Sequence, residues 1–356
     1  MKYYGARFFF FLLMSLGCVD KADIALVSQQ LPFIIEAAVT NAPGSDTVKI
    51  TKAYPADGGY YSRVGVSGAK VRIISDAGES DRLTDIGRGM YITDTLQGVI
   101  GRSYQLLVSL SDQNGEHHYQ STAQRMLPAG AIDGITYEFT SQVNSSTGLS
   151  ENGFNVYVNS SVSVSSSRRL RYKILGTYKV NTNPELIQIR TDCATPPCPT
   201  MSLPCATNCE CCVCWVSERE KFPVLLDPDF VGGTTITRIP VHYIPINNYT
   251  FNERYRVEVT QMELSQDVYD FYSALRKQML NASSLFQPPF FELRGNVEAQ
   301  NQGPRVVGIF SATATTRQHL YINRGDVPYD MVSEPIAADC RAVAKNSSNQ
   351  IPPFWE

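Results

Sequence analysis

The feature that most constrains the fold is a series of short β-type runs separated by turn residues. Turn signals such as Asn41-Ala42-Pro43-Gly44 lie between the runs, and Asp112-Gln113-Asn114-Gly115 is typical of a β-hairpin. Short strands at this spacing predict an immunoglobulin-like β-sandwich, which we expect over residues 33–126. The runs are Phe33–Thr40, Thr47–Ala53, Ala69–Ser75, Gly89–Asp94, Tyr104–Ser111 and His117–Thr122.

Alternating β-type runs resume after a linker at residues 127–131. We therefore expect a second, mainly β domain over residues 132–340, followed by a C-terminal tail at residues 341–356. The fold class is then mainly β. The expected strands are Ile135–Phe139, Gly153–Val164, Leu170–Val180, Thr234–His242, Tyr255–Glu263, Val306–Ala312 and His319–Ile322.

One amphipathic helix is expected in the second domain, near residues 265–280. Ser265 is a good N-cap, and Asp267 would lie in the first turn, where the helix dipole favours a negative charge. The helix should pack on a sheet through one apolar face. That face consists of Val268, Tyr272, Leu275 and Met279.

Residues 1–17 have the organisation of a signal peptide. Lys2 and Arg7 give a positive start, and the apolar run Phe8–Leu16 is too short for a transmembrane helix, which needs about 20 residues. Ser15-Leu16-Gly17-Cys18 looks like a bacterial lipobox, so we predict cleavage before Cys18, lipidation of its sulfur and a lipid-anchored tether at residues 18–32. The alternative is that Cys18 is an ordinary residue near the cleavage site of a soluble secreted protein.

The charge of the chain argues against nucleic-acid binding. The formal net charge is −3, from 31 Lys and Arg against 34 Asp and Glu, and it becomes −5 when Lys2 and Arg7 leave with the signal peptide. A nucleic-acid site needs clustered basic residues, and the basic pairs of this sequence are short. No later segment is long enough for a transmembrane helix, so we expect the body to be tethered to the membrane by lipid alone.

A Pro-rich segment at residues 193–214 contains seven of the nine cysteines and predicts a Cys-rich loop. An exported chain meets an oxidising compartment, so the eight cysteines other than Cys18 predict disulfides. Seven cannot pair among themselves, so one should pair with Cys340, and the neighbours Cys211 and Cys212 should take different partners. A zinc or copper(I) site at Cys209-x-Cys211-Cys212-x-Cys214 is the alternative. The disulfide candidates are Cys193, Cys198, Cys205, Cys209, Cys211, Cys212, Cys214 and Cys340.

The sequence carries no motif that indicates an enzyme. It has four histidines, and it has no H-E-x-x-H, G-x-S-x-G, P-loop or dinucleotide-binding glycine pattern. His117 and His118 are neighbours in an expected strand and should point to opposite faces, so they are poor partners for one metal ion. We predict no catalytic residue, no cofactor and no metal ligand. A glycosidase-like pair of carboxylates is the alternative that the sequence leaves open.

The second half of the chain contains a series of recognisable segments, namely Cys214-Trp215, Tyr255–Gln261, Leu264-Ser265, Val268–Tyr272, Ser284–Phe286, Pro288-Pro289, Arg294–Val297, Val307–Ala312 and Cys340. In these residues it resembles a Bacteroidota outer-membrane lipoprotein family catalogued as domain of unknown function 4249. This chain has Tyr272 where the resemblance leads us to expect tryptophan. Gly295-Asn296 predicts a tight turn that favours positive φ.

The resemblance implies a lipoprotein of the cell outer membrane whose genes often accompany TonB-dependent receptors. We therefore expect a non-catalytic binding accessory that docks on such a receptor or captures its cargo, a peptide, glycan or other small molecule. The membrane, through the lipid anchor, and the receptor are the expected partners. A structural or adhesive surface protein is the first alternative, and a hydrolase is the second.

Overall fold

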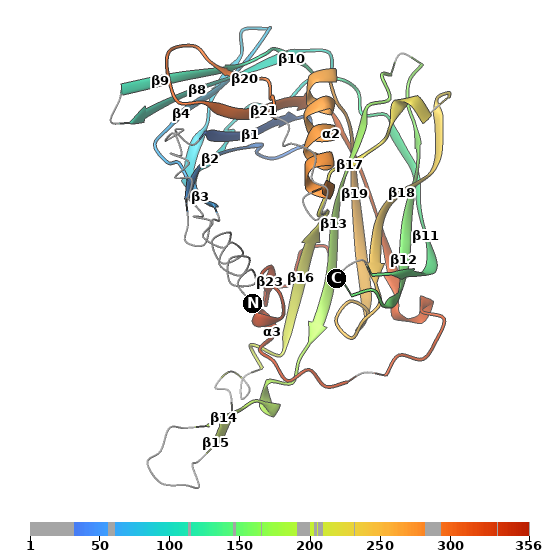
Figure 1. Cartoon of the computed structure of the whole chain (residues 1–356). Coiled ribbons are helices and arrows are strands. Elements are labelled where there is room, and N and C mark those ends of the chain that lie inside the picture. The colour runs from blue at the N-terminus through green and yellow to red at the C-terminus, as the bar shows by residue number, and fades with distance from the viewer. Residues whose placement is uncertain are drawn as a thin grey trace, which may run out of the picture. The chain divides into compact units, whose positions relative to one another are not determined.

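The computed structural model is mainly β, and its described part contains five sheets and two α-helices (Figure 1). Pro32–Glu356 forms one compact unit. The structure describes residues 32–55, 61–112, 115–144, 147–164, 166–190, 200–202, 205, 209–230, 232–281, 293–332 and 334–355.

Two sheets, A and B, form the first sandwich. Sheet A has the order β21-β1-β2-β7-β6, with β3 also paired to β2, and sheet B has the order β20-β9-β8-β4-β5, with β10 also paired to β8. The strands of sheet A are β1 (Phe33–Thr40), β2 (Thr47–Pro55), β3 (Tyr61–Gly65), β6 (Thr84–Gly87), β7 (Met90–Ile92) and β21 (Val306–Thr313). Those of sheet B are β4 (Lys70–Ser75), β5 (Ser80–Arg82), β8 (Ser103–Asp112), β9 (Gly115–Ser121), β10 (Gln124–Arg125) and β20 (Val297–Ala299).

Alternation along each strand builds the core between these two sheets. In β1 the side chains of Phe33, Ile35 and Val39 are buried, whereas Glu36 between them is exposed. Tyr104, Leu106 and Val108 of β8 enter the same core from the other sheet. Both sets lie within runs that the sequence predicts as strands, so the expected β-sandwich is confirmed.

The first sandwich extends beyond the expected boundary at residue 126. Strand β21 pairs in parallel with β1, with Phe33 opposite Val306, and β20 pairs with β9, with Val297 opposite Ser121. We expected residues 306–312 to be a strand of the second domain, but they complete the first sandwich. The physical reason is that β1 would otherwise expose an unpaired edge, which β21 covers.

Two further sheets, C and D, form a second sandwich around their own core. Sheet C has the order β11-β12-β18 and sheet D the order β22-β19-β13-β16-β23, with β17 also paired to β13. The strands are β11 (Ala131–Val143), β12 (Ser150–Ser161), β13 (Leu170–Asn181), β16 (Val213–Arg219), β17 (Val224–Leu225), β18 (Thr235–Pro245), β19 (Arg254–Glu263), β22 (Thr315–Asn323) and β23 (Ser347–Ser348). A separate pair is formed by β14 (Gln188–Arg190) and β15 (Thr200–Ser202), and 3-10 turns occur at Pro184–Leu186, Pro228–Phe230 and Arg324–Asp326.

The C-terminal residues are part of this second sandwich, which corrects the expected tail at residues 341–356. Helix α3 (Cys340–Val343) leads into β23, where Ser348 pairs with Trp215. Trp355 is buried, and its ring lies edge-on to that of Trp215 with the ring centroids 6.5 Å apart. Burial of a large aromatic ring holds the end of the chain against sheet D.

Helix α2 (Gln266–Asn281) confirms the expected helix and packs where the two sandwiches meet. Its buried Val268 and Phe271 contact Ile309 of β21 and Leu225 of β17, which lie on either side of it in Figure 1. One residue, Ala314, separates β21 of sheet A from β22 of sheet D, so the chain passes directly from the first sandwich into the second at this point. No helix in the described ranges is long and apolar enough to cross a membrane.

Gly295 and Asn296 do not form the expected tight turn. A Cβ atom on Gly295 would lie 1.6 Å from the carbonyl oxygen of Gly308, so glycine is required by close approach of two backbones. The buried Asn296 side chain donates to the oxygen of Phe310 and accepts from its nitrogen, both at 2.8 Å. This dipeptide therefore fastens β20 to β21.

Candidate functional site

A cavity of about 830 Å³ lies on the outer face of sheet A, opposite the core of the first sandwich. The side chains of β1 that do not enter that core, Ile34, Glu36 and Ala38, border it. Helix α2 supplies a second wall through Phe271 and Tyr272. Small-molecule sites have volumes of roughly 300–1,000 Å³ and mostly apolar walls, so this cavity has the size and lining of one.

Strand β13 supplies a third wall, and this wall is cationic. Tyr172 and Ile174 are buried in the second core, so the alternating residues Arg171 and Lys173 face the other way and line the cavity. Glu220, just after β16, lies beside them. The strand pattern thus places two cations next to each other on one wall.

Arg171 is held by an aromatic ring and a carboxylate. Its guanidinium carbon lies 3.9 Å from the centroid of the Tyr272 ring, and its Nη2 lies 3.6 Å from Oε1 of Glu220. The Arg171 and Glu220 side chains are only 12% and 13% exposed. Glu220 accepts a hydrogen bond from the backbone N–H of Ile174 at 3.0 Å. Nε of Arg171 is buried and has no acceptor in the part of the chain that the structure describes.

Lys173 is the second cation of this wall. Burial, helped by the nearby charges of Arg171 and Arg219, lowers the pKa of its ammonium group from the usual 10.5 to about 8, although Glu220 and Asp46 act against the shift. None of the described residues forms a hydrogen bond or a close ion pair with this ammonium group. A partly buried ammonium group without a partner destabilises the empty protein. The same group would attract an anion that enters the cavity.

A second cavity of about 360 Å³ adjoins the other side of Lys173. Its lining is polar and includes Asp46, Arg219, Glu258 and Arg317. Burial raises the pKa of Asp46, and hydrogen bonds from the backbone and hydroxyl of Thr40 work against that shift. Lys173 therefore lies between a largely apolar cavity and a polar one.

The four histidines lie on three different sheets, and none of them is among the described residues that line this cavity. His117 and His118 belong to β9 of sheet B, His242 to β18 of sheet C and His319 to β22 of sheet D. His117 is buried and His118 is exposed, so the expectation that they point to opposite faces is confirmed. The described lining of the larger cavity contains no Ser, Cys or His, and its two glutamates form ion pairs, Glu36 with Arg63 and Glu220 with Arg171.

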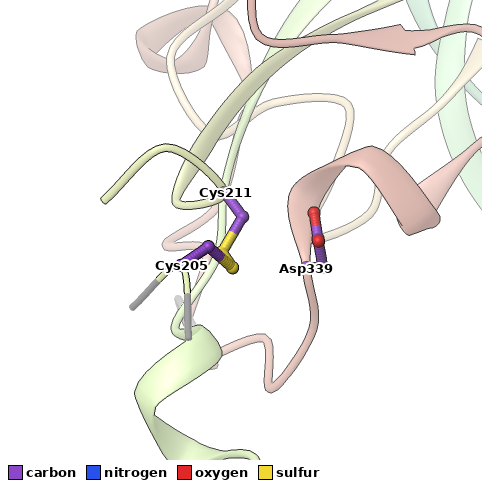
Figure 2. Close-up of side chains that lie close together, drawn as sticks. All are labelled: Cys205, Cys211 and Asp339. Carbon is purple, nitrogen blue, oxygen red and sulfur yellow. A yellow bond between two sulfur atoms is a disulfide. The ribbon is translucent and has the colours of Figure 1, made fainter. Parts of the chain in front are cut away.

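Six of the eight candidate cysteines form three disulfides, Cys205–Cys211, Cys209–Cys212 and Cys214–Cys340. This confirms that a cysteine of the loop pairs with Cys340 and that Cys211 and Cys212 take different partners. Cys205 and Cys211 face Asp339, with the three ligand atoms within 4.8 Å of one another (Figure 2). The disulfide consumes the thiolates that a metal ion would require. Cys18, Cys193 and Cys198 lie outside the described residues.

The model of one protein family, described as Domain of unknown function (DUF4249), matches residues 23–319. The chain belongs to this family. The DUF4249 match covers both sandwiches as far as β22, and it includes helix α2 and every strand that borders the larger cavity. The family identified from the residues of the second half of the chain is therefore confirmed as a domain of unknown function.

This chain was also compared with curated proteins and with solved structures. No curated protein matches this DUF4249 chain. A DUF4785 family protein from Legionella pneumophila is similar at 12% sequence identity, over 64% of this chain and 50% of that chain, with a TM-score of 0.17. The chain thus spans about half the length of that protein.

The cavity of this DUF4249 chain was missed by sequence reasoning. Arg171 and Lys173 belong to a predicted strand, Leu170–Val180, and a charged residue at every second position there indicates only a solvated face. Tyr272 was noted because it stands where we expected tryptophan, and its ring now lies against Arg171. The sequence does show two cations at alternate positions of one strand and aromatic residues on one helix. It does not show that this strand and this helix lie side by side.

Proposed function

We propose that this chain is a Bacteroidota outer-membrane lipoprotein, anchored through Cys18, that acts as a non-catalytic binding accessory of a TonB-dependent receptor. In this proposal the cavity between sheet A, helix α2 and β13 captures the cargo of the receptor. The signal-peptide and lipobox pattern of residues 1–18 supports the anchor, and the resemblance of the second half to such lipoproteins supports the partner.

The observation that carries the binding role is the chemistry of the cavity walls. Its volume of about 830 Å³ suits a small molecule or a short peptide segment. Apolar side chains from β1 and α2 provide contact area, and Arg171 and Lys173 provide directional polar groups. A mostly apolar site with a few fixed polar groups is typical of small-molecule binding.

Mass spectrometry of the mature protein tests the anchor. We expect a mature N-terminus at Cys18 that carries acyl chains, and a Cys18→Ala variant that is absent from the membrane fraction. Two or more acyl chains hold a protein stably on a bilayer, whereas one holds it only marginally. A native protein that begins beyond Cys18, or that carries no acyl chain, would contradict the proposal.

Co-purification from solubilised outer membranes tests the partner. We expect a tagged full-length chain to recover a TonB-dependent receptor, and to recover more of it when the cargo is present. The matched control is an unrelated tagged lipoprotein of the same membrane, because it shares the anchor and not the body. Recovery of the protein alone under all conditions would reject docking on a receptor.

A second candidate role, adhesion to another envelope or host surface, is favoured by a cluster of exposed aromatic rings. Tyr137 and Phe139 of β11 and Tyr329 are each about 40% exposed, and the rings of Phe139 and Tyr329 lie 6.1 Å apart. Exposed aromatic groups are enriched at protein interfaces. A Phe139→Ser, Tyr329→Ser variant that grows normally on the cargo but loses surface attachment would favour adhesion over uptake.

A further inference from the structure

The two cations on β13 have donor groups that no described residue satisfies. Nε of the Arg171 guanidinium is buried without an acceptor, and the ion pair with Glu220 at 3.6 Å is longer than a hydrogen bond. The ammonium of Lys173 has no hydrogen-bond acceptor in the described part of the chain. Both side chains face the cavity from alternate positions of one strand. Donors arranged in this way are complementary to an acidic group.

The balance of charge in the cavity points the same way. Six cationic side chains line it against two carboxylates, although the whole chain has a net charge of −3. Both carboxylates are already ion-paired, Glu36 with Arg63 and Glu220 with Arg171. The described lining therefore carries more positive than negative charge. The six cations are Lys49, Arg63, Arg171, Lys173, Lys221 and Arg305.

Next to the two cations of β13, much of the cavity lining is apolar. Phe271 and Leu275 of helix α2 lie there with Val307 and Ile309 of β21, and Ile34 of β1 continues the surface. Such a wall favours an apolar body through burial of surface from water. The cavity thus combines the two cations of β13 with an apolar surface from helix α2, β1 and β21.

We propose that the ligand is an anionic amphiphile, an apolar molecule with one acidic group, whose acidic group contacts Arg171 and Lys173 while its body packs against helix α2 and β21. This inference rests on the proposed function, because it assigns a chemical class to the cargo of the same cavity. The acidic group is the shared chemistry of two sources, a fatty acid and the C-terminal carboxylate of an apolar peptide.

Two fluorescent probes that differ in one acidic group test the assignment. The anionic probe is 8-anilinonaphthalene-1-sulfonate, and the neutral probe is N-phenyl-1-naphthylamine, which has the same aromatic body without the sulfonate. The protein is the secreted mature chain, residues 18–356, with Cys18→Ser so that no acyl chain of its own enters the cavity. Dodecanoate and trileucine are then added as competitors to distinguish the two sources.

The variants separate the charge of Lys173 from its place in the fold. We expect Lys173→Met to weaken binding of the anionic probe by about tenfold or more and Lys173→Arg to retain it, because loss of a half-buried charge partner leaves the other charge unpaired. Lys179→Met is the matched control, since it removes the same charge from the same strand, where Lys179 pairs with Glu253. The neutral probe should bind equally to all of them.

A measurement on the unaltered sequence covers the case in which Lys173→Met does not fold. Raising the salt concentration should weaken the anionic probe and leave the neutral probe unchanged, because salt screens only the charged contact. Equal salt dependence for both probes, or a Lys173→Met variant that binds the anionic probe normally, overturns the anionic class. If the neutral probe still binds, the cavity remains a ligand site and the proposed function stands. If neither probe binds, the inference and the cargo-capture role both fail, and docking on a receptor is judged by co-purification.

Discussion

Gln124 donates a hydrogen bond from Nε2 to Oδ2 of Asp267 at 2.7 Å, which joins β10 of the first sandwich to the first turn of helix α2. Nδ2 of Asn296 donates to the same oxygen at 3.1 Å. Three segments that are distant in the sequence therefore meet at one carboxylate. This contact holds the helix that forms one wall of the cavity, so it links the fold to the proposed binding site.

Replacement of Asp267 by Asn should destabilise the protein. Asparagine keeps one acceptor oxygen and replaces the other with an NH2 donor, so it must lose either the bonds from Gln124 and Asn296 or the bond from Ser265. We expect a loss of about 1–2 kcal/mol in the free energy of unfolding at pH 7. Urea unfolding of the native protein and of the Asp267→Asn variant measures this difference in the free energy of unfolding. Asp270→Asn is the control, because Asp270 is exposed on the same helix and pairs only locally with Gln266. Equal losses for the two variants would show that this carboxylate does not join the segments.

The Asp267 carboxylate should also make the free energy of unfolding depend on pH in the acidic range. Burial acts to raise the pKa of Asp267, but hydrogen bonds from Ser265, Asn296 and Gln124 outweigh it and lower the pKa below the usual 3.8. Because the pKa is lowered in the folded state, the ionised Asp267 carboxylate stabilises the protein fully above about pH 4. This stabilisation is lost as the pH falls through the folded-state pKa. The difference between the native protein and Asp267→Asn should therefore shrink between pH 5 and pH 2, roughly the window in which carboxyl groups protonate. A difference that stays constant over that window would contradict the assignment.

Replacement of Lys173 by Met should stabilise the empty protein while weakening ligand binding. The folded-state pKa of about 8 lies below the usual 10.5, so the charged form is disfavoured in the folded state. Between these values the unfolded chain binds more protons, and stability rises with pH. We expect Lys173→Met to gain about 1–3 kcal/mol at pH 7 and to lose this advantage near pH 10. Thermal unfolding at both pH values is the measurement, and an unchanged or lowered midpoint at pH 7 would reject the explanation.

Loss of the Cys214–Cys340 disulfide should cost more than loss of the Cys205–Cys211 disulfide. The first joins residues 126 positions apart and the second residues 6 apart. In the chain-entropy account the expected losses are about 5 and about 2 kcal/mol, because the longer loop restricts the unfolded chain more. Denaturant unfolding of the two double Cys→Ser variants compares them. A larger loss from the short loop would show that native contacts, and not chain entropy, set the order.

Gly295→Ala should be strongly destabilising. The new Cβ would lie 1.6 Å from the carbonyl oxygen of Gly308, and backbone cannot move aside as a flexible side chain can. Overpacking of this kind costs about 1–3 kcal/mol, or more when backbone is displaced. Gly134→Ala in β11 is the matched control, since nothing lies within 4 Å of its added Cβ. Thermal unfolding should separate the two variants clearly, and a harmless Gly295→Ala would disprove the close approach.

Local elements of this fold could be predicted because their signals are local. β1 has the predicted bounds Phe33–Thr40, since its alternation of buried and exposed residues follows directly from the strand repeat. Helix α2 begins one residue after Ser265, as the N-cap and the apolar period of the helix indicate. The link between the loop and Cys340 also followed from counting, because seven cysteines cannot all pair with one another.

Pairing between distant segments could not be predicted. β21 has the same strand pattern wherever it pairs, and nothing in residues 306–313 indicates a parallel partner at residues 33–40. Gly295 was expected to provide positive φ, whereas it provides room for Gly308. A glycine has both uses, and only its neighbours in space show which one applies.

The sequence by itself determined the mainly β class, the positions of most strands, the helix, the cysteine chemistry and the family. Only the tertiary structure decided that the first sandwich is completed by β20 and β21, and that Arg171 and Lys173 line one cavity together with apolar residues of helix α2. The physical reason is the distance along the chain over which each signal acts. Strand alternation, helix caps and disulfide parity act through neighbouring residues or simple counting, whereas a cavity wall exists only when segments far apart in the chain pack together and leave some of their side chains uncovered.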